Sequence, residues 1–108
     1  MVNRDRLDTL LAEATLDCYD EEEEFMGVLC AIEGNLNFPL QAKVLGDPVV
    51  VIGLDDERSG PRRGILARVR KGDREYSVAL AELEFADLDP VSVEWLDVYR
   101  YWSGEMED

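Results

Sequence analysis

The stretch ILARVRKGDREYSVAL, residues 65–80, contains two runs of strand-forming residues on either side of a turn. The first run ends at Arg70, the second begins at Arg74, and Lys71-Gly72-Asp73 separates them. Apolar and aromatic residues on both sides of a short polar turn with glycine are typical of a β-hairpin. The stretch therefore predicts two antiparallel strands, and it makes an antiparallel sheet the central feature of the fold.

The residues before this hairpin predict two more strands. Residues 40–44 alternate between apolar and polar side chains, and residues 49–54 are almost continuously apolar. Gly46-Asp47-Pro48 has the composition of the turn that would join them. Residues 55–64 contain no large apolar side chain and predict a surface loop. Four short antiparallel strands this close together suggest a small barrel or curled sheet.

Two helices are predicted before the sheet. In residues 4–13 the leucines recur at helical spacing behind Asn3, which we expect to cap the helix. A clearer helix follows, because Asp20 and Glu23 have the spacing of a capping box and Gly34 offers a C-terminal stop. The apolar stripe of this second helix consists of Phe25, Val28, Leu29 and Ile32.

A third helix is predicted after the sheet. Asp89 is a suitable N-cap, Pro90 suits the first helical position, and Gly104 suits the end of the helix. Residues 105–108 predict a mobile tail. The fold class that we predict is therefore α+β: one domain, residues 1–108, with a small antiparallel barrel-like sheet of about four strands flanked by N-terminal helices and a C-terminal helix. The apolar face of the third helix consists of Val91, Trp95, Val98, Tyr99 and Trp102.

The charge of the chain is strongly negative and unevenly distributed. The formal net charge is −14; residues 1–34 carry ten acids and two bases, residues 35–74 five and eight, and residues 75–108 ten and one. A field of this sign repels nucleic acid and anionic lipid and attracts cations and basic proteins. Since no apolar run approaches membrane-spanning length and the N-terminus does not resemble a signal peptide, we expect a cytoplasmic protein that binds neither nucleic acid nor membrane.

The residue types present argue against catalysis. The chain has no histidine, four serines and two threonines, so a nucleophilic triad has no base. A carboxylate pair that cleaves sugars would need a cleft that a chain of this size is not expected to provide. Cys18 and Cys30 are far apart and lack histidine neighbours, which favours buried thiols over a disulfide or a zinc site. We therefore expect no enzymatic activity.

The acidic segment, residues 17–24, is the most distinctive chemical feature of the sequence. It contains six carboxylates in eight residues, directly before the second predicted helix. Crowded carboxylates repel one another unless a hard cation neutralises them, and an all-oxygen donor set suits Ca²⁺ better than zinc. The alternative is a solvated helix start whose negative charge interacts favourably with the helix dipole. No EF-hand loop is present, so ligands would have to come from separate segments.

Three groups of acidic residues could supply such ligands: the acidic segment, the start of the loop at 55–57, and the connection at 84–89. Each group could instead be solubilising charge, and Asp20 and Asp89 could serve only as helix caps. The metal ligands that we predict are Asp17, Asp20, Glu21, Glu24, Asp55, Asp56, Asp87 and Asp89.

A basic cluster lies between the acidic ends, and it is defined by Arg58, Arg62, Arg63, Arg68, Arg70, Lys71 and Arg74. We expect these residues to pair mainly with the acidic ends of the chain itself. A competing function follows from the same pattern: a protein–protein interaction module that docks a partner, for example a basic protein, through its acidic ends or its basic hairpin. Adaptation to high salt is a third explanation of the charge.

Several segments resemble one family, the small acidic calcium-binding proteins of cyanobacteria known as CcbP-like. The resemblance begins in DCYDEEE at 17–23 and continues in LNFPLQAK at 36–43, in VVVIGL at 49–54, in YSVALAELE at 76–84 and in YRYW at 99–102. It implies a barrel-like sheet with flanking helices, a cytoplasmic location and calcium buffering linked to signalling, with Ca²⁺ held by surface carboxylates.

The resemblance is most specific at Asp17, Asp20 and Glu21, which match the family motif. The loop after Leu54 departs from the family pattern, because arginines stand where we expect a more acidic stretch. These cations would lower calcium affinity nearby, at residues 55–57.

Overall fold

The computed structural model describes residues 4–104, and these residues form two compact units. The helical unit contains the residues up to Leu36 and those from Asp89 onward, and the sheet unit contains Asn37–Leu88. The predicted cap Asn3 and the predicted tail at 105–108 lie outside the described residues. The single domain that the sequence suggests stays a prediction.

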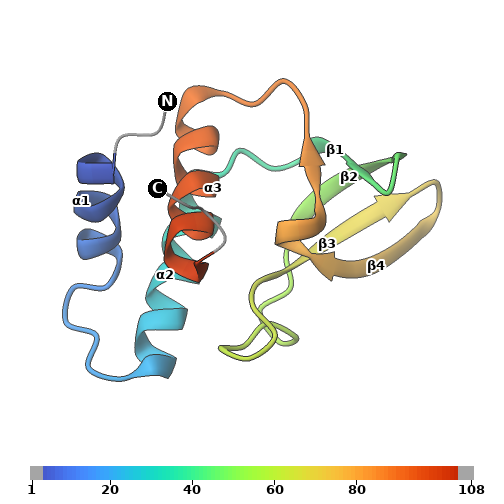
Figure 1. Cartoon of the computed structure of the whole chain (residues 1–108). Helices are drawn as coiled ribbons and strands as arrows, with labels where there is room; N and C mark the ends of the chain where they lie inside the picture. The colour runs from blue at the N-terminus through green and yellow to red at the C-terminus, as the bar shows by residue number, and fades with distance from the viewer. Residues whose placement is uncertain (1–3, 105–108) are drawn as a thin grey trace. The chain divides into compact units, whose positions relative to one another are not determined.

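The helical unit consists of α1 (Arg4–Ala14), α2 (Glu21–Asn35) and α3 (Pro90–Ser103), each of which contacts the other two (Figure 1). The predicted apolar stripes supply its core, although Val91 is exposed and Trp102 only half-buried. The Trp102 ring of α3 contacts the Phe25 ring of α2, with 6.0 Å between ring centroids. It also contacts the Tyr99 ring within α3, at 6.4 Å. The buried apolar side chains here are Leu7, Leu10, Phe25, Val28, Leu29, Ile32, Leu36, Trp95, Leu96, Val98 and Tyr99.

Most of the predicted helix ends are correct. Asp20 caps α2, Asp89 caps α3 with Pro90 at its start, and Gly104 ends α3 with a φ of 84°. The predicted stop at Gly34 is wrong, because α2 continues through Asn35 and ends at the extended residue Leu36. A glycine near the end of a helix marks its stop only where the backbone turns to positive φ, and Gly34 does not do so.

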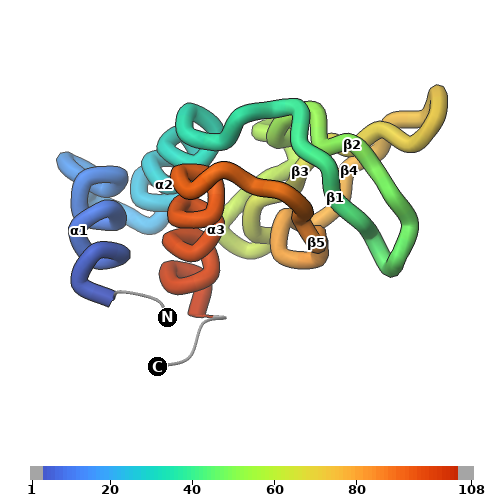
Figure 2. Tube along the Cα trace, turned by 90° about the horizontal axis from the view of Figure 1, so that it is seen from above, coloured from blue at the N-terminus to red at the C-terminus, as the bar shows by residue number. Residues whose placement is uncertain are grey.

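The sheet unit is an antiparallel sheet of five strands in the order β4-β3-β2-β1-β5 (Figure 2). The bounds are β1 Leu40–Val44, β2 Asp47–Leu54, β3 Leu66–Lys71, β4 Arg74–Ala79 and β5 Glu84–Phe85, with a short 3₁₀ helix at Leu80–Glu82. The α+β class and the antiparallel sheet are confirmed. The sheet is open, with β4 and β5 at its edges, and it is therefore not a closed barrel.

Two details of the sheet differ from the prediction. The turn between β1 and β2 is Leu45-Gly46, both with positive φ, while Asp47 and Pro48 already pair with β1. Pro48 is tolerated because β2 begins to pair with β3 only at Val50. The strand β5 was expected to be part of a connection; two residues carry too little pattern to be recognised as a strand.

Alternation along the strands separates an apolar face of the sheet from a charged one. Ala67 and Val69 of β3 are fully buried, whereas Arg68 and Arg70 between and beyond them are exposed. Because paired residues in an antiparallel sheet share a face, Ser77 and Glu75 of β4 lie on the same face as Arg68 and Arg70. The exposed face therefore brings basic, acidic and hydroxyl side chains together.

Candidate metal centre

The acidic segment begins in the turn that joins α1 to α2. The turn is closed by two backbone hydrogen bonds, from Thr15 N–H to the Leu11 carbonyl at 3.0 Å and from Cys18 N–H to the Thr15 carbonyl at 3.0 Å. Asp17 has a φ of 64°, in the left-handed region that aspartate adopts more readily than most residues. The turn therefore presents Asp17 on the surface shortly before α2 begins.

Two carboxylates of the acidic segment are used to start α2. Asp20 Oδ1 accepts a hydrogen bond of 2.8 Å from Glu23 N–H, and Glu23 Oε2 accepts one of 3.2 Å from Tyr19 N–H. This is close to the predicted capping box, except that Glu23 reaches the residue before the cap and not the cap itself. Within residues 4–104, the second oxygen of Asp20, Oδ2, accepts no hydrogen bond and is available for another partner.

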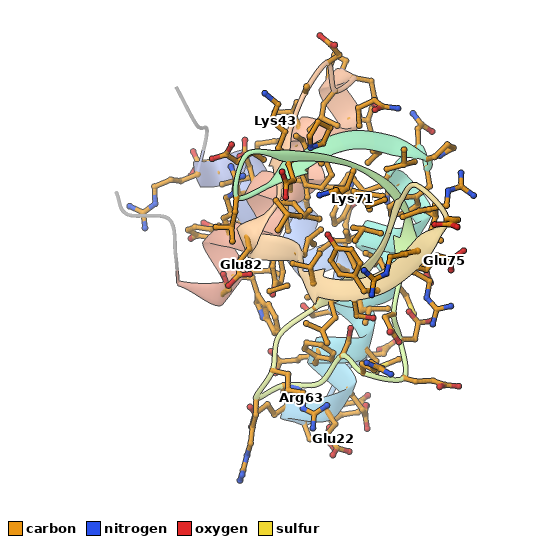
Figure 3. All side chains as sticks on the ribbon, turned by 90° about the vertical axis from the view of Figure 1, so that its right-hand side faces the viewer. Glu22, Lys43, Arg63, Lys71, Glu75 and Glu82 are labelled. Carbon is orange, nitrogen blue, oxygen red and sulfur yellow. The ribbon has the colours of Figure 1, made fainter. Side chains whose placement is uncertain are left out.

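Four further carboxylates of the segment are exposed and have no hydrogen bond or ion pair among the described residues. They lie in the turn and in the first turn of α2, where Glu22 extends outward from the helix (Figure 3). These residues are Asp17, Glu21, Glu22 and Glu24.

The electrostatic field of the segment acts on Cys18, whose thiol is half-buried within it. Burial raises the pKa of this thiol, and the negative charges of Glu23, Glu24, Asp17 and Asp20 raise it further. A thiolate at Cys18 is disfavoured because its negative charge would be repelled by these four carboxylates. The expectation of two buried thiols is wrong, because Cys18 is only half-buried and Cys30 is exposed; both are free cysteines.

Gly27 holds this turn against α2. A side-chain carbon at position 27 would lie 2.5 Å from the carbonyl oxygen of Ala14 and 3.1 Å from Cys18 Sγ. Only glycine allows the end of α1 to approach the helix this closely. Met26-Gly27 is one of the segments that resemble the family, and an isolated glycine within a helical pattern can mark a position with a packing reason.

In the sheet unit, Asp55 is buried, with a relative exposure of 5%, and both of its oxygens are occupied. Oδ1 accepts a 3.2 Å hydrogen bond from Arg58 N–H, and Oδ2 accepts a hydrogen bond from the hydroxyl of Ser77. The Ser77 hydrogen bond is the main cause that holds the pKa of Asp55 below its usual value; the Arg58 N–H and the charges of Arg68 and Arg58 add to it, and burial opposes them. Asp55 therefore anchors the loop after β2 to strand β4.

Replacement of Ser77 by alanine tests this anchor. Loss of a hydrogen bond to a charged group is expected to lower the free energy of unfolding by about 1.5–3 kcal/mol at pH 7. Because the pKa of Asp55 is depressed in the folded state, its stabilisation is present above about pH 4 and is lost as the pH falls through the folded-state pKa. The deficit of Ser77→Ala should therefore shrink between pH 7 and pH 3, as measured by urea unfolding with hydrogen exchange of β3 and β4. An equal deficit at both pH values, or one no larger than that of the exposed control Ser103→Ala, would contradict the assignment.

The other predicted ligands fall into both units. Asp56 and Asp87 are exposed residues of the sheet unit, and Asp87 has a φ of 55°. Asp89 belongs to the helical unit, where it accepts hydrogen bonds from Ser92 N–H at 3.1 Å and from Ser92 Oγ at 2.6 Å. In residues 4–104, no three histidine, cysteine or acidic side chains stand close enough to hold one metal ion. The predicted ligands therefore do not form a preassembled site within the described part of the chain.

The basic cluster pairs with acids of the sheet unit. Lys71 Nζ lies 3.0 Å from Asp47 Oδ2, and Arg68 lies 3.9 Å from Asp55 and 4.0 Å from Glu75. Asp47 and Asp55 belong to the middle of the sequence, and only Glu75 belongs to the acidic ends, where the prediction placed the partners. Among the described residues, four members of the cluster have no ion pair: Arg62, Arg63, Arg70 and Arg74.

Comparison with known proteins identifies the class of protein that this fold and acidic surface define. The calcium-binding family model Calci_bind_CcbP, described as calcium binding, matches residues 8–103. The chain therefore belongs to the CcbP family of calcium-binding proteins. This result confirms the resemblance seen in the sequence, and it does not favour the interaction module as the function. No significant match was found among curated protein sequences.

Two solved structures share the fold. The crystal structure of CcbP from Anabaena has 23% sequence identity and a TM-score of 0.81, with 95% of this chain and 92% of that chain covered. A calcium-binding protein in its calcium-binding form has 23% identity and a TM-score of 0.73, with 97% of both chains covered. At this identity the two structures establish the fold alone.

Among residues 4–104, no helix is long and apolar enough to cross a bilayer.

Proposed function

We propose that this chain binds Ca²⁺ without catalysing a reaction, and that the acidic segment supplies its main ligands, Asp17, Asp20, Glu21 and Glu24. The observation that carries the proposal is the family match over residues 8–103, which includes the whole acidic segment. The exposed, unpaired carboxylates of that segment support it, because they can accept an ion without breaking an existing contact.

The donor set fits calcium chemically. Ca²⁺ takes six to eight oxygen ligands at flexible geometry, and carboxylates can bind it through one oxygen or two. Mg²⁺ demands a regular octahedron and keeps its waters, which a set of mobile surface carboxylates does not enforce. Since the side chains are not preassembled, binding requires rotamer changes that bring them together, with water completing the coordination. The gain is the loss of mutual repulsion between the crowded charges.

The remaining predicted ligands differ in how readily they could contribute. Asp56 and Asp87 are exposed and stay predictions as additional ligands. Asp55 and Asp89 would each have to give up hydrogen bonds to their own loop or helix before they could bind an ion. Action as a calcium buffer or sensor, a role in signalling, a cytoplasmic location and a basic protein partner belong to the same proposal.

A calorimetric titration of the calcium-free protein with Ca²⁺, in a buffer that contains Mg²⁺, tests the proposal. We expect saturable binding and a rise in Tm, because a ligand at a hundredfold excess over Kd stabilises the folded state by about 2.7 kcal/mol. The triple variant Asp17→Asn, Glu21→Gln, Glu24→Gln should bind about tenfold more weakly or worse, since affinity depends on ligand charge. It retains the cap at Asp20.

A second triple variant is the matched control. Glu13→Gln, Asp73→Asn and Glu82→Gln remove the same amount of charge from three exposed positions outside the acidic segment. Calcium affinity should stay within about twofold of the unmodified chain. Equal losses in both triple variants would indicate a diffuse ion atmosphere, and the absence of saturable heat in the unmodified protein would refute calcium binding altogether.

A further inference from the structure

The exposed side of the sheet unit contains a surface cavity that calcium binding does not explain. Its volume is about 340 Å³, and it is lined by Arg58 from the loop after β2, Arg68 from β3, and Glu75, Tyr76 and Ser77 from β4. All of these residues belong to the sheet unit. Two arginines, one glutamate, one serine and one tyrosine therefore line one pocket.

The two arginines keep their hydrogen-bond donors available. Arg58 Nε lies 3.7 Å from Asp55 Oδ2, and the two terminal nitrogens of Arg68 lie 3.9 Å from Asp55 and 4.0 Å from Glu75. Each distance is too long for a hydrogen bond, and within residues 4–104 neither guanidinium donates one. The acids thus attract the arginines electrostatically without using their N–H groups.

The negative charge of Asp55 attracts both Arg58 and Arg68. Each of its oxygens accepts one hydrogen bond, from the Ser77 hydroxyl or from Arg58 N–H, and the two guanidinium groups lie beyond hydrogen-bond distance of it. The side chains of Arg58 and Arg68 remain 68% and 53% exposed. Two exposed guanidinium groups therefore lie near one buried carboxylate without hydrogen bonds to it.

The surroundings add positive charge. A second cavity of about 310 Å³ shares Glu75 and Tyr76 with the first and is lined in addition by Lys71 and Arg74; Lys71 and Glu75 are labelled in Figure 3. From position 58 to position 74 the chain has seven basic residues and one acidic residue. This excess is opposite in sign to the net charge of the protein, so it marks a local preference for anions.

We propose that the cavity lined by Arg58 and Arg68 binds the phosphate group of a small ligand. Arginine forks match phosphate oxygens in two-point hydrogen bonds, and both arginines line this cavity. The cavity is larger than a phosphate ion, so it has room for a phosphate ester as well as for the free ion.

The test is a calorimetric titration of the full chain in calcium-free buffer with EDTA and about 100 mM NaCl, where exposed long-range attraction is screened. Inorganic phosphate and AMP are the probes. Saturable binding of phosphate or AMP to one site supports the phosphate pocket. If AMP binds more tightly than phosphate, the natural ligand is a phosphate ester. If both bind equally, the natural ligand is the free ion. Absence of saturable binding by both probes overturns the proposal.

Three substitutions locate the site. Arg58→Gln and Arg68→Gln should each weaken binding about tenfold or more, because each removes charged hydrogen bonds to the ligand. Arg62→Gln removes the same charge from an exposed arginine that does not line the cavity, and it should leave the affinity within about twofold. Equal losses in all three variants would overturn a specific pocket. The calcium titration of Arg58→Gln should be unchanged, which separates this site from the acidic segment.

Discussion

Replacement of Phe25 by alanine is expected to lower the free energy of unfolding by about 3–5 kcal/mol. Phe25 is 2% exposed and contacts Trp102, so its removal leaves a cavity in the core of the helical unit. Since small domains are stable by only about 5–15 kcal/mol, this loss is a large fraction of the total stability. Phe25 also follows Glu24 directly, and we therefore expect calcium affinity to fall with stability.

Urea unfolding followed by tryptophan fluorescence measures the loss of stability of the helical unit. The chain has two tryptophans, Trp95 and Trp102, and both lie in α3. The neighbouring residue Met26 is 46% exposed, so Met26→Ala is a control in the same helix turn, expected to change stability by less than about 0.5 kcal/mol. A loss below about 1 kcal/mol in Phe25→Ala would mean that the ring is not part of a well-packed core.

Replacement of Gly27 by alanine should destabilise the helical unit by about 1–3 kcal/mol. The added carbon would meet the carbonyl oxygen of Ala14 at 2.5 Å, and this atom is backbone that cannot rotate away. The end of α1 and the turn with Asp17 must then move away from α2. Calcium binding should weaken in the same variant, because the turn presents the first carboxylate of the acidic segment.

Gly34 provides a control of opposite sign in the same helix. A side-chain carbon at Gly34 has no atom within 4 Å, so Gly34→Ala adds helix propensity without a clash. This substitution should stabilise the protein by about 0.5–1 kcal/mol and leave calcium affinity unchanged. Thermal unfolding of both variants decides the matter: if Gly27→Ala raises Tm as Gly34→Ala does, the close approach of α1 and α2 is absent in solution.

Local patterns predicted most of the secondary structure because the forces that produce them act over a few residues. The stripe of Phe25, Val28, Leu29 and Ile32 repeats with the helical period, and the cap residues Asp20 and Asp89 act on backbone groups three positions away. The open edge of the sheet could not be predicted in the same way. The strand β5 exists through pairing with β1, which lies about forty residues earlier in the chain.

The acidic segment was evident from the sequence, since its residues are adjacent in the chain. The role of Asp55 was not, because it depends on Ser77, which comes 22 positions later and reaches Asp55 only after β3 and β4 have paired. An acidic residue at the start of a polar loop looks the same whether it binds an ion, anchors the loop or is solvated. Its burial distinguishes Asp55 from Asp56, which remains exposed.

The division of the chain into a helical unit and a sheet unit also affects when each unit can fold during synthesis. Residues 37–88 are continuous, so every strand of the sheet is synthesised before α3. The helical unit is discontinuous, and α1 and α2 must wait for residues 90–103 before their shared core can close. During translation the carboxylates at 17–24 are thus present on a nascent chain long before the scaffold that will hold them. A protein of this design can bind its ion in the final geometry only once the last helix has been made.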